Sequence, residues 1–125
     1  MNLQKRALAF AGLCLAAGIG LGAFGAHALE DILTPERLDT WETAVSYQMW
    51  NSLGMLVVVL IGTHFQLNVA WVVRLLGAGI LIFSGSLYLL CLTNSTWLGA
   101  ITPLGGLAFI IGWVLFSVQI IKAKF

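Results

Sequence analysis

Charge is what this sequence has least of. Charged side chains make up 9% of the 125 residues, and positions 75 to 121, 47 residues in a row, carry none. A water-soluble domain of this length needs charged residues over its whole surface, whereas this chain is 60% hydrophobic with a mean hydropathy of +0.98. Composition therefore predicts a single transmembrane domain over residues 1–125 and no separate soluble domain. The formal net charge of +1 argues against nucleic-acid binding, which needs a basic face.

Reactive side chains are scarce as well. The two cysteines, Cys14 and Cys91, fall at different depths of different apolar runs, so no disulfide is expected. His27 follows the first run and His64 the second, so a full membrane thickness separates them and they cannot share a metal ion. There is no phosphate-binding loop, no G-x-S-x-G motif and no carboxylate inside an apolar run. The sequence predicts neither a metal nor a cofactor, and no enzymatic activity.

Four apolar runs have the length of membrane spans. The first contains 20 residues, which as a helix measures roughly 30 Å and matches the hydrocarbon core of a bilayer. An all-α fold is predicted, a four-helix transmembrane bundle with spans at about 7–26, 44–63, 71–92 and 97–121. The first run with its Ala26-His27-Ala28 end also resembles a secretory signal with a cleavage site. Signal peptides have apolar regions of about 7–15 residues, however, so a membrane span is the preferred interpretation.

The charges orient the four spans. Four crossings place both termini on one side, and Lys and Arg are retained on the cytoplasmic side of a membrane. With the termini cytoplasmic, only Arg37 among the basic residues faces outward, and all five carboxylates lie in the outer connection. We therefore expect a multi-pass protein of the bacterial inner (cytoplasmic) membrane with both termini cytoplasmic. Arg74, Trp71 and Trp97 lie near span ends and are predicted to anchor them at the interface.

The outer connection, residues 27–43, carries its own helix signal. Thr34 is a suitable N-cap, Pro35 suits the first helical position, and Glu36 is favoured there by the helix dipole. Apolar residues then recur at helical spacing, at Leu38, Trp41 and Val45. A short amphipathic segment is predicted to lie on the outer surface and to lead into the second span.

Small residues recur at every fourth position of the first span, a spacing that lets helix backbones approach closely in lipid. Glycines are also frequent in the fourth span. The partner of the first span is either another span of the same chain or a second copy. The predicted helix-packing residues are Gly12, Ala16, Gly18, Gly20, Gly22, Gly105, Gly106 and Gly112.

Polar side chains collect in the outer half of the predicted bundle, whereas the inner half is aliphatic. An unsatisfied polar group in lipid costs several kcal/mol, so these side chains should face one another inside the bundle. One possibility is that they form hydrogen bonds between helices, worth about 0.6–2 kcal/mol each. The other is that they line a small cavity open to the outer face, with His27 as its titratable member. The predicted cluster comprises His27, Tyr47, Gln48, Asn51, Ser84, Ser86, Tyr88 and Thr102.

Four short motifs carry a resemblance to a known family. They are Gly22-Ala-Phe-Gly-Ala-His27, Trp41-Glu-Thr-Ala-Val-Ser-Tyr47-Gln48, Phe83-Ser-Gly-Ser-Leu-Tyr88, and Thr102-Pro-Leu-Gly-Gly106 followed by Gly112-Trp113. In this order they resemble the YgdD/YwdK-like small membrane proteins, domain of unknown function 423, which are related to transmembrane protein 256. The resemblance implies a four-span inner-membrane protein and supplies no activity. The family commonly has histidine where this chain has Asn51, and asparagine at that place favours packing or polar binding over metal chemistry.

Two functions from different classes follow from these observations. The first is a small non-enzymatic membrane protein with a structural, assembly or partner-binding role, whose partners are the lipid bilayer and another membrane protein or a second copy. The alternative is a transporter or channel component for a small solute or lipid, which would use the outer polar cluster. A continuous cavity lined by the cluster would favour the alternative, and side chains satisfied by neighbouring helices would favour the first.

Overall fold

The computed structural model of the chain describes residues 2–125. Within these residues lie four helical rods, each a single helix or a run of consecutive helical segments. Each rod is long and apolar enough to cross a membrane, which confirms the predicted all-α class with four candidate spans. The third rod contains one π-helical turn, and the fourth begins with a 3₁₀ turn. In chain order the elements are α1 (Leu3–Ala28), α2 (Pro35–His64), α3 (Ala70–Gly79), the π turn η1 (Ile80–Ser84), α4 (Gly85–Thr93), the 3₁₀ turn η2 (Thr96–Ala100) and α5 (Thr102–Lys122).

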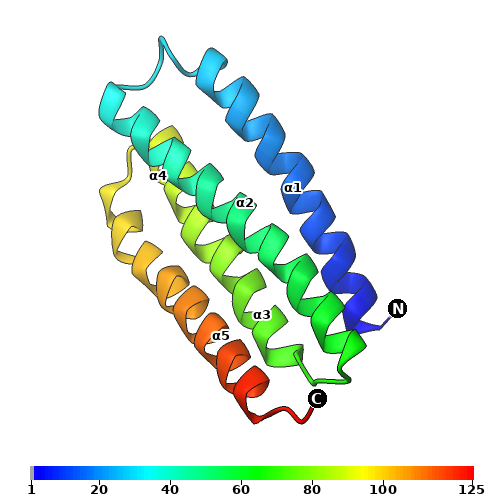
Figure 1. The fold of residues 1–125 in the computed structure, drawn as a ribbon. Coiled ribbons are helices and arrows are strands. Elements are labelled where there is room, and N and C mark those ends of the chain that lie inside the picture. Colours follow the sequence, from blue (N-terminus) through cyan, green and yellow to red (C-terminus); the bar gives the residue numbers. More distant parts are fainter. Residues whose placement is uncertain (1) are drawn as a thin grey trace.

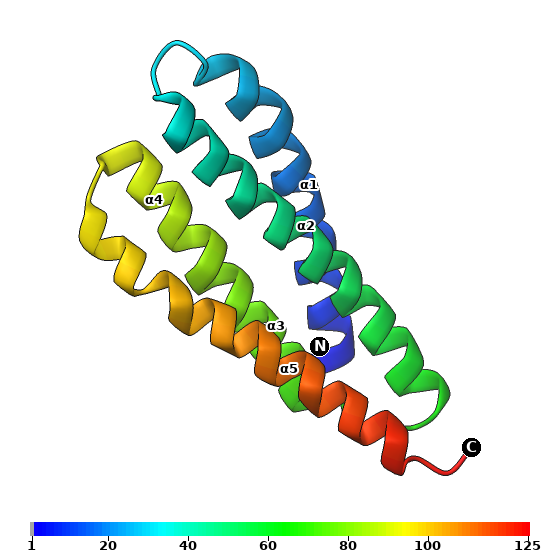
Figure 2. The same cartoon turned by 60° about the vertical axis from the view of Figure 1, so that its left-hand side comes forward.

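The four rods lie side by side and alternate in direction (Figure 1). The first helix packs chiefly on α2, while α5 packs on α3 and η1, and Figure 2 shows the same two pairs from another side. Both termini lie at one end, which we call the basic end because Lys5, Arg6, Arg74, Lys122 and Lys124 belong to it. The opposite end carries all five carboxylates and is called the acidic end.

An aliphatic core fills the basic half of the bundle. Val58, Val72 and Leu76 have no exposed surface, and Met55 and Phe109 are 1% and 5% exposed. These side chains come from α2, α3 and α5, so this core joins three of the four rods. The first helix reaches it only through its amino-terminal half, with Ala7 and Ala11.

The outer connection is helical at both ends. The first helix continues to Ala28 and α2 begins at Pro35, so most of the predicted loop 27–43 is helical, and the second rod begins well before residue 44. The predicted cap is confirmed, because the Thr34 hydroxyl accepts a hydrogen bond from the backbone N–H of Arg37 at 3.2 Å. The helix signal at Thr34 and Pro35 locates this start, whereas hydropathy locates only the apolar part of the helix.

A π-helical turn interrupts the third rod at Ile80–Ser84, where a regular helix was expected. Its neighbour across the interface is Gly105 on α5. A Cβ atom at Gly105 would collide with the backbone nitrogen of Phe83 and come within 2.8 Å of its Cα. The absence of a side chain at Gly105 therefore permits backbone-to-backbone contact between α5 and the π turn.

Candidate functional site

Gln48 is the centre of the polar cluster and joins three rods. Its side chain is 5% exposed, and its Nε2 donates to the backbone carbonyl of Cys14 on α1 at 2.7 Å. Its Oε1 accepts a hydrogen bond from the Tyr88 hydroxyl on α4 at 2.7 Å. The Ser52 hydroxyl donates to the backbone carbonyl of Gln48 at 2.5 Å. One amide thus satisfies a donor and an acceptor on two neighbouring helices, in a place where unpaired polar groups are costly.

Asn51, one turn further along α2, connects α2 to α5. Its Oδ1 accepts a hydrogen bond from the indole N–H of Trp113 at 2.9 Å, and its Nδ2 donates to the backbone carbonyl of Tyr47 at 2.9 Å. The indole ring lies over Gly54, where a Cβ atom would collide with it. Glycine at this position therefore makes the space in which Trp113 reaches Asn51.

Serine and threonine hydroxyls connect the remaining pairs of helices. The Ser84 hydroxyl, at the end of the π turn, donates to the backbone carbonyl of Ala44 on α2 at 2.7 Å. The hydroxyls of Ser86 and Thr102 lie 2.6 Å apart and join α4 to α5. Thr102 also donates to the carbonyl of Leu98 at 3.2 Å. Each hydroxyl is thereby paired inside the bundle.

Two predicted members of the cluster, His27 and Tyr47, have exposed side chains, and His27 lies apart from the others. His27 is exposed at the acidic end and borders a pocket of about 440 Å³ together with Glu30, Trp41 and Glu42. The ring of Tyr47, 37% exposed, packs against Phe83 at a centroid distance of 4.6 Å, on the side of α2 that faces α5. The histidine and the buried amides therefore do not line a common cavity.

Contacts at the acidic end extend the same pattern through residues that the prediction did not include. The indole N–H of Trp41 donates to the carbonyl of Leu21 on α1 at 2.8 Å, and its ring occupies the space left by Gly25. The Arg37 guanidinium donates to the Oδ1 of Asn94 at 2.9 and 3.2 Å. Asn94 ends α4 in the left-handed conformation, with φ of 54°. The contact of Trp41 with α1 could have been predicted from the sequence, because Trp41 and Gly25 lie at similar depths on antiparallel helices.

The predicted packing residues divide into two rows on α1. Gly18 and Gly22 face α2, where a Cβ atom on the first would collide with Met49 and one on the second would meet Val45 at 3.2 Å. Gly12 and Gly20 face away, since a Cβ atom at either would meet nothing within 4 Å, and Ala16 is exposed.

On α5, a Cβ atom at Gly112 would meet Leu76 at 3.2 Å, and one at Gly106 would meet the Phe83 ring at 3.7 Å. The predicted interfacial residues are exposed, with Trp71 at 64% and Trp97 at 65%, and the Arg74 guanidinium lies 5.1 Å from the centroid of the Trp71 ring.

The contacts within the cluster are hydrogen bonds. Within residues 2–125, no three His, Cys, Asp or Glu side chains lie close enough together to hold a metal ion, and Cys14 and Cys91 are both free. Over the same residues, Gln119 Oε1 is the only buried side-chain nitrogen or oxygen without a hydrogen-bond partner. Gln119 lies near the end of α5, where its Nε2 donates to the carbonyl of Asn68, so it belongs to the basic end and not to the cluster.

Comparison with known proteins places this arrangement in a family. The sequence model described as "Protein of unknown function (DUF423)" matches residues 21–106. The chain belongs to this family. A UPF0382 membrane protein of Staphylococcus epidermidis is 51% identical over 104 residues, which are 83% of this chain and 85% of the relative. The UPF0382 membrane protein YwdK of Bacillus subtilis is 46% identical over 109 residues, 83% of this chain and 86% of the relative. No solved structure matches the chain.

The region of this DUF423 protein that matches the family includes all eight residues of the predicted cluster. Gln48, Asn51, Ser84 and Tyr88 all lie within residues 21–106, whereas Trp113 lies outside. The α1 partner of Gln48 is also outside, but it is a backbone carbonyl and does not depend on the side chain at that position. The side chains that form the hydrogen bonds among α1, α2 and α4 therefore lie in the region that matches the family.

Proposed function

We propose that this DUF423 protein is a non-enzymatic membrane protein that binds another transmembrane segment, from a partner protein or a second copy, through the exposed face of α1. The observation that carries the proposal is the internal use of the polar cluster. Gln48, Asn51 and Ser84 each bond to a neighbouring helix of the same chain. Polar groups that bond in this way hold a bundle together, and their principal hydrogen bonds are made inside the chain.

The first helix offers the contact surface. Gly12, Ala16 and Gly20 form a row of small residues at fourth-residue spacing on the side of α1 opposite α2, and the structure leaves open space over both glycines. Large apolar side chains stand beside it, with Leu13 71% and Ile19 62% exposed. Close approach of a second helix over small residues gains van der Waals contact that lipid chains do not match in full.

A comparison of two equivalent substitutions tests the proposal. Gly20→Leu places a large side chain in the row of small residues on α1. Gly85→Leu makes the same change at a glycine on α4 that also has open space around it. After cross-linking in intact membranes and purification in a gentle detergent, the unaltered protein and Gly85→Leu are expected to carry a stoichiometric partner or second copy, and Gly20→Leu is expected to lose it. A solitary unaltered protein, or equal recovery of the partner with both variants, would contradict the proposal.

The alternative, a transporter or channel component, needs a continuous polar cavity. The buried amides of Gln48 and Asn51 bond to different helices, and His27 borders a separate pocket at the acidic end. This separation supports the binding role over the transport role.

The orientation is a further part of the proposal. With the basic end cytoplasmic, five of six Lys/Arg side chains face inward and every carboxylate faces outward, as the distribution of positive charge in membrane proteins requires. The amphipathic first turns of α2, from Pro35, would then lie at the outer surface of a bacterial cytoplasmic membrane. A membrane-impermeant thiol reagent added outside should modify Asp39→Cys and leave Lys124→Cys unmodified, in a background without the native cysteines. The reverse pattern would refute this orientation.

A further inference from the structure

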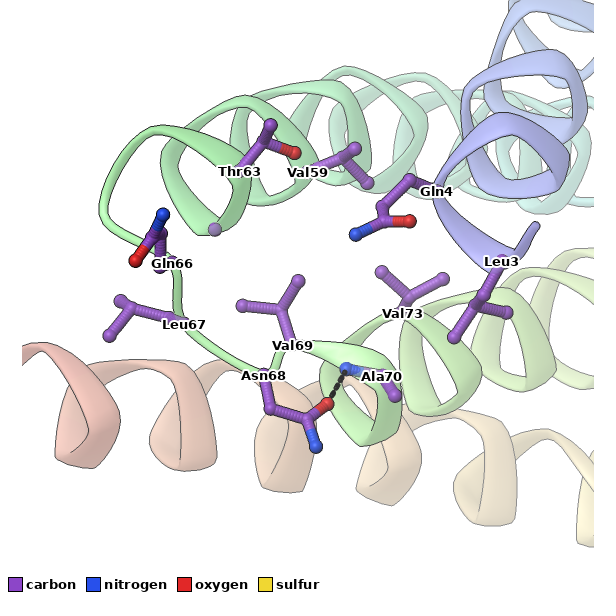
Figure 3. A pocket seen from close by; sticks show the side chains of 11 residues that line it. Leu3, Gln4, Val59, Thr63, Gln66, Leu67, Asn68, Val69, Ala70 and Val73 are labelled. Carbon is purple, nitrogen blue, oxygen red and sulfur yellow. Dashed lines mark hydrogen bonds between the residues drawn. The ribbon is translucent and has the colours of Figure 1, made fainter.

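A pocket with both polar and aliphatic walls opens at the basic end, beneath the amino terminus of α1. It has a volume of about 530 Å³, within the range of ligand sites, and lies between α1, the carboxyl end of α2 and the start of α3. Figure 3 shows the Gln4 amide extending into the space between these elements, with Thr63 and Gln66 on the α2 side. Val59, Val69 and Val73 supply apolar wall. The pocket therefore combines amide and hydroxyl groups with an aliphatic lining.

An apolar groove adjoins this pocket. Its volume is about 210 Å³, and it shares two wall residues with the pocket, Leu3 and Val73. The remaining walls come from α1, α2 and the third rod, and they lead from the basic end toward the middle of the bundle. Apart from Arg6 they are apolar: Ala7, Phe10, Met55, Gly77 and Leu81. The pocket and the apolar groove therefore lie next to each other, with Leu3 and Val73 in the wall of both.

The charge around this hollow has one sign. Arg6 itself lines the groove, and Arg74 follows directly after the shared wall residue Val73 on α3. The basic end carries five of the six Lys/Arg side chains, whereas every Asp and Glu side chain lies at the other end of the bundle. A negatively charged headgroup would therefore meet attraction there with no opposing carboxylate side chain. Basic pockets between transmembrane helices on the cytoplasmic side are a recurrent way of binding anionic lipid headgroups.

We propose that this hollow is a binding site for one anionic phospholipid, with its phosphate beside Arg6 in the wall of the groove, the polar remainder of its headgroup in the pocket and one acyl chain in the groove. A free phosphate would use only the polar part, and a neutral lipid would gain nothing from the cations. The combination of both compartments fits an amphiphile with negative charge. The site lies on a different surface from the α1 face proposed to bind a helix, so either proposal can fail alone.

Gly77 provides a way to block the groove without disturbing the core. A Cβ atom at this position would lie 3.7 Å from Met55 Cε and 3.7 Å from Phe10 Cε1, which are ordinary van der Waals distances. The further carbons of a leucine would then occupy the groove itself. Gly77→Leu should exclude an acyl chain and leave the fold intact, and Gly85→Leu is the matched control at an open glycine outside the hollow.

Native mass spectrometry tests the site directly. The protein is released into gentle detergent from bilayers of equal parts phosphatidylglycerol and phosphatidylcholine, and the lipid retained per chain is counted. The unaltered protein, Gly85→Leu and Lys124→Gln are expected to retain one phosphatidylglycerol, and Gly77→Leu to retain none. Arg6→Gln should weaken retention about fivefold, the factor that corresponds to roughly 1 kcal/mol per basic side chain.

Three results would overturn the proposal. Equal retention of the two lipids would remove the role of charge, and equal losses with Arg6→Gln and Lys124→Gln would reduce it to general attraction at a basic surface. Release of the lipid by millimolar glycerol phosphate would show that the apolar groove adds nothing. Thermal unfolding of each variant in detergent, unchanged from that of the unaltered protein, ensures that a loss of lipid reports on the site.

Discussion

The hydrogen bond between Gln48 and Tyr88 yields a quantitative prediction about what holds the bundle together. Gln48→Met keeps an unbranched side chain of similar length, but removes both the donation to the Cys14 carbonyl and the acceptor of the Tyr88 hydroxyl. Polar contacts between transmembrane helices average about 0.6 kcal/mol and reach about 1.7 kcal/mol. Two such contacts predict a loss of about 1–3 kcal/mol in the free energy of unfolding.

A double-mutant cycle isolates the contact between the two side chains. Combining Gln48→Met with Tyr88→Phe should give a coupling energy of about 0.6–1.7 kcal/mol, because the second change removes nothing that the first has left in place. The measurement is reversible unfolding in mixed micelles with increasing dodecyl sulfate, followed by tryptophan fluorescence. Tyr88→Phe with Ser117→Ala is the control pair, since the Ser117 hydroxyl bonds to the Trp113 carbonyl within its own helix. A Gln48–Tyr88 coupling no larger than the control, within about 0.3–0.5 kcal/mol of zero, would refute the claim that these polar groups join the helices.

Three further changes test neighbouring contacts by the same unfolding assay. Gly105→Ala should destabilise the protein by about 1–3 kcal/mol because its Cβ would strike the backbone of Phe83, whereas Gly106→Ala should cost little, and equal effects would contradict the close approach at the π turn. Trp113→Phe should cost about 1 kcal/mol through loss of the indole donor to Asn51, and a neutral result would show that this bond contributes nothing. Trp41→Phe should cost a similar amount, since the ring remains packed while its donation to the Leu21 carbonyl is lost, and no change in stability would contradict that contact.

Sequence was enough to predict which polar side chains could meet. Gln48, Ser84 and Tyr88 lie at similar depths on helices that run in opposite directions, and a buried polar group in lipid needs a partner. The structure brings Gln48 together with Tyr88 and pairs Ser84 with an α2 carbonyl. His27 also falls at the right depth by position, but it stands beyond the packed part of the bundle and remains exposed.

The rotation of each helix could not be read in the same way. On α1, the rows through Gly18 and through Ala16 have the same fourth-residue spacing, and positions two residues apart point about 200° away from each other. Which row faces inward depends on the partner surface. Side chains on α2, such as Met49 and Trp41, fill the spaces over Gly18 and Gly25, so the other row turns outward.

The π turn at Ile80–Ser84 also left no recognisable pattern in the sequence. It contains no proline, and its residues continue the apolar run of the third span. Its position is tied to a residue far along the chain, because the bare backbone of Gly105 is what lets Phe83 approach. Such a pairing is a property of two surfaces in contact, and neither segment alone specifies it.

The central claim is that the buried polar side chains bond to side chains and backbone carbonyls of the bundle and do not line a path for water or solutes. Accessibility of Ser84, which is 1% exposed and lies on η1 facing α2, measures this most directly. In intact membranes of a strain producing a protein without native cysteines, a small hydrophilic thiol reagent should leave Ser84→Cys unmodified while it reacts fully with Asp39→Cys. Modification of Ser84→Cys at a rate close to that of Asp39→Cys would contradict the account.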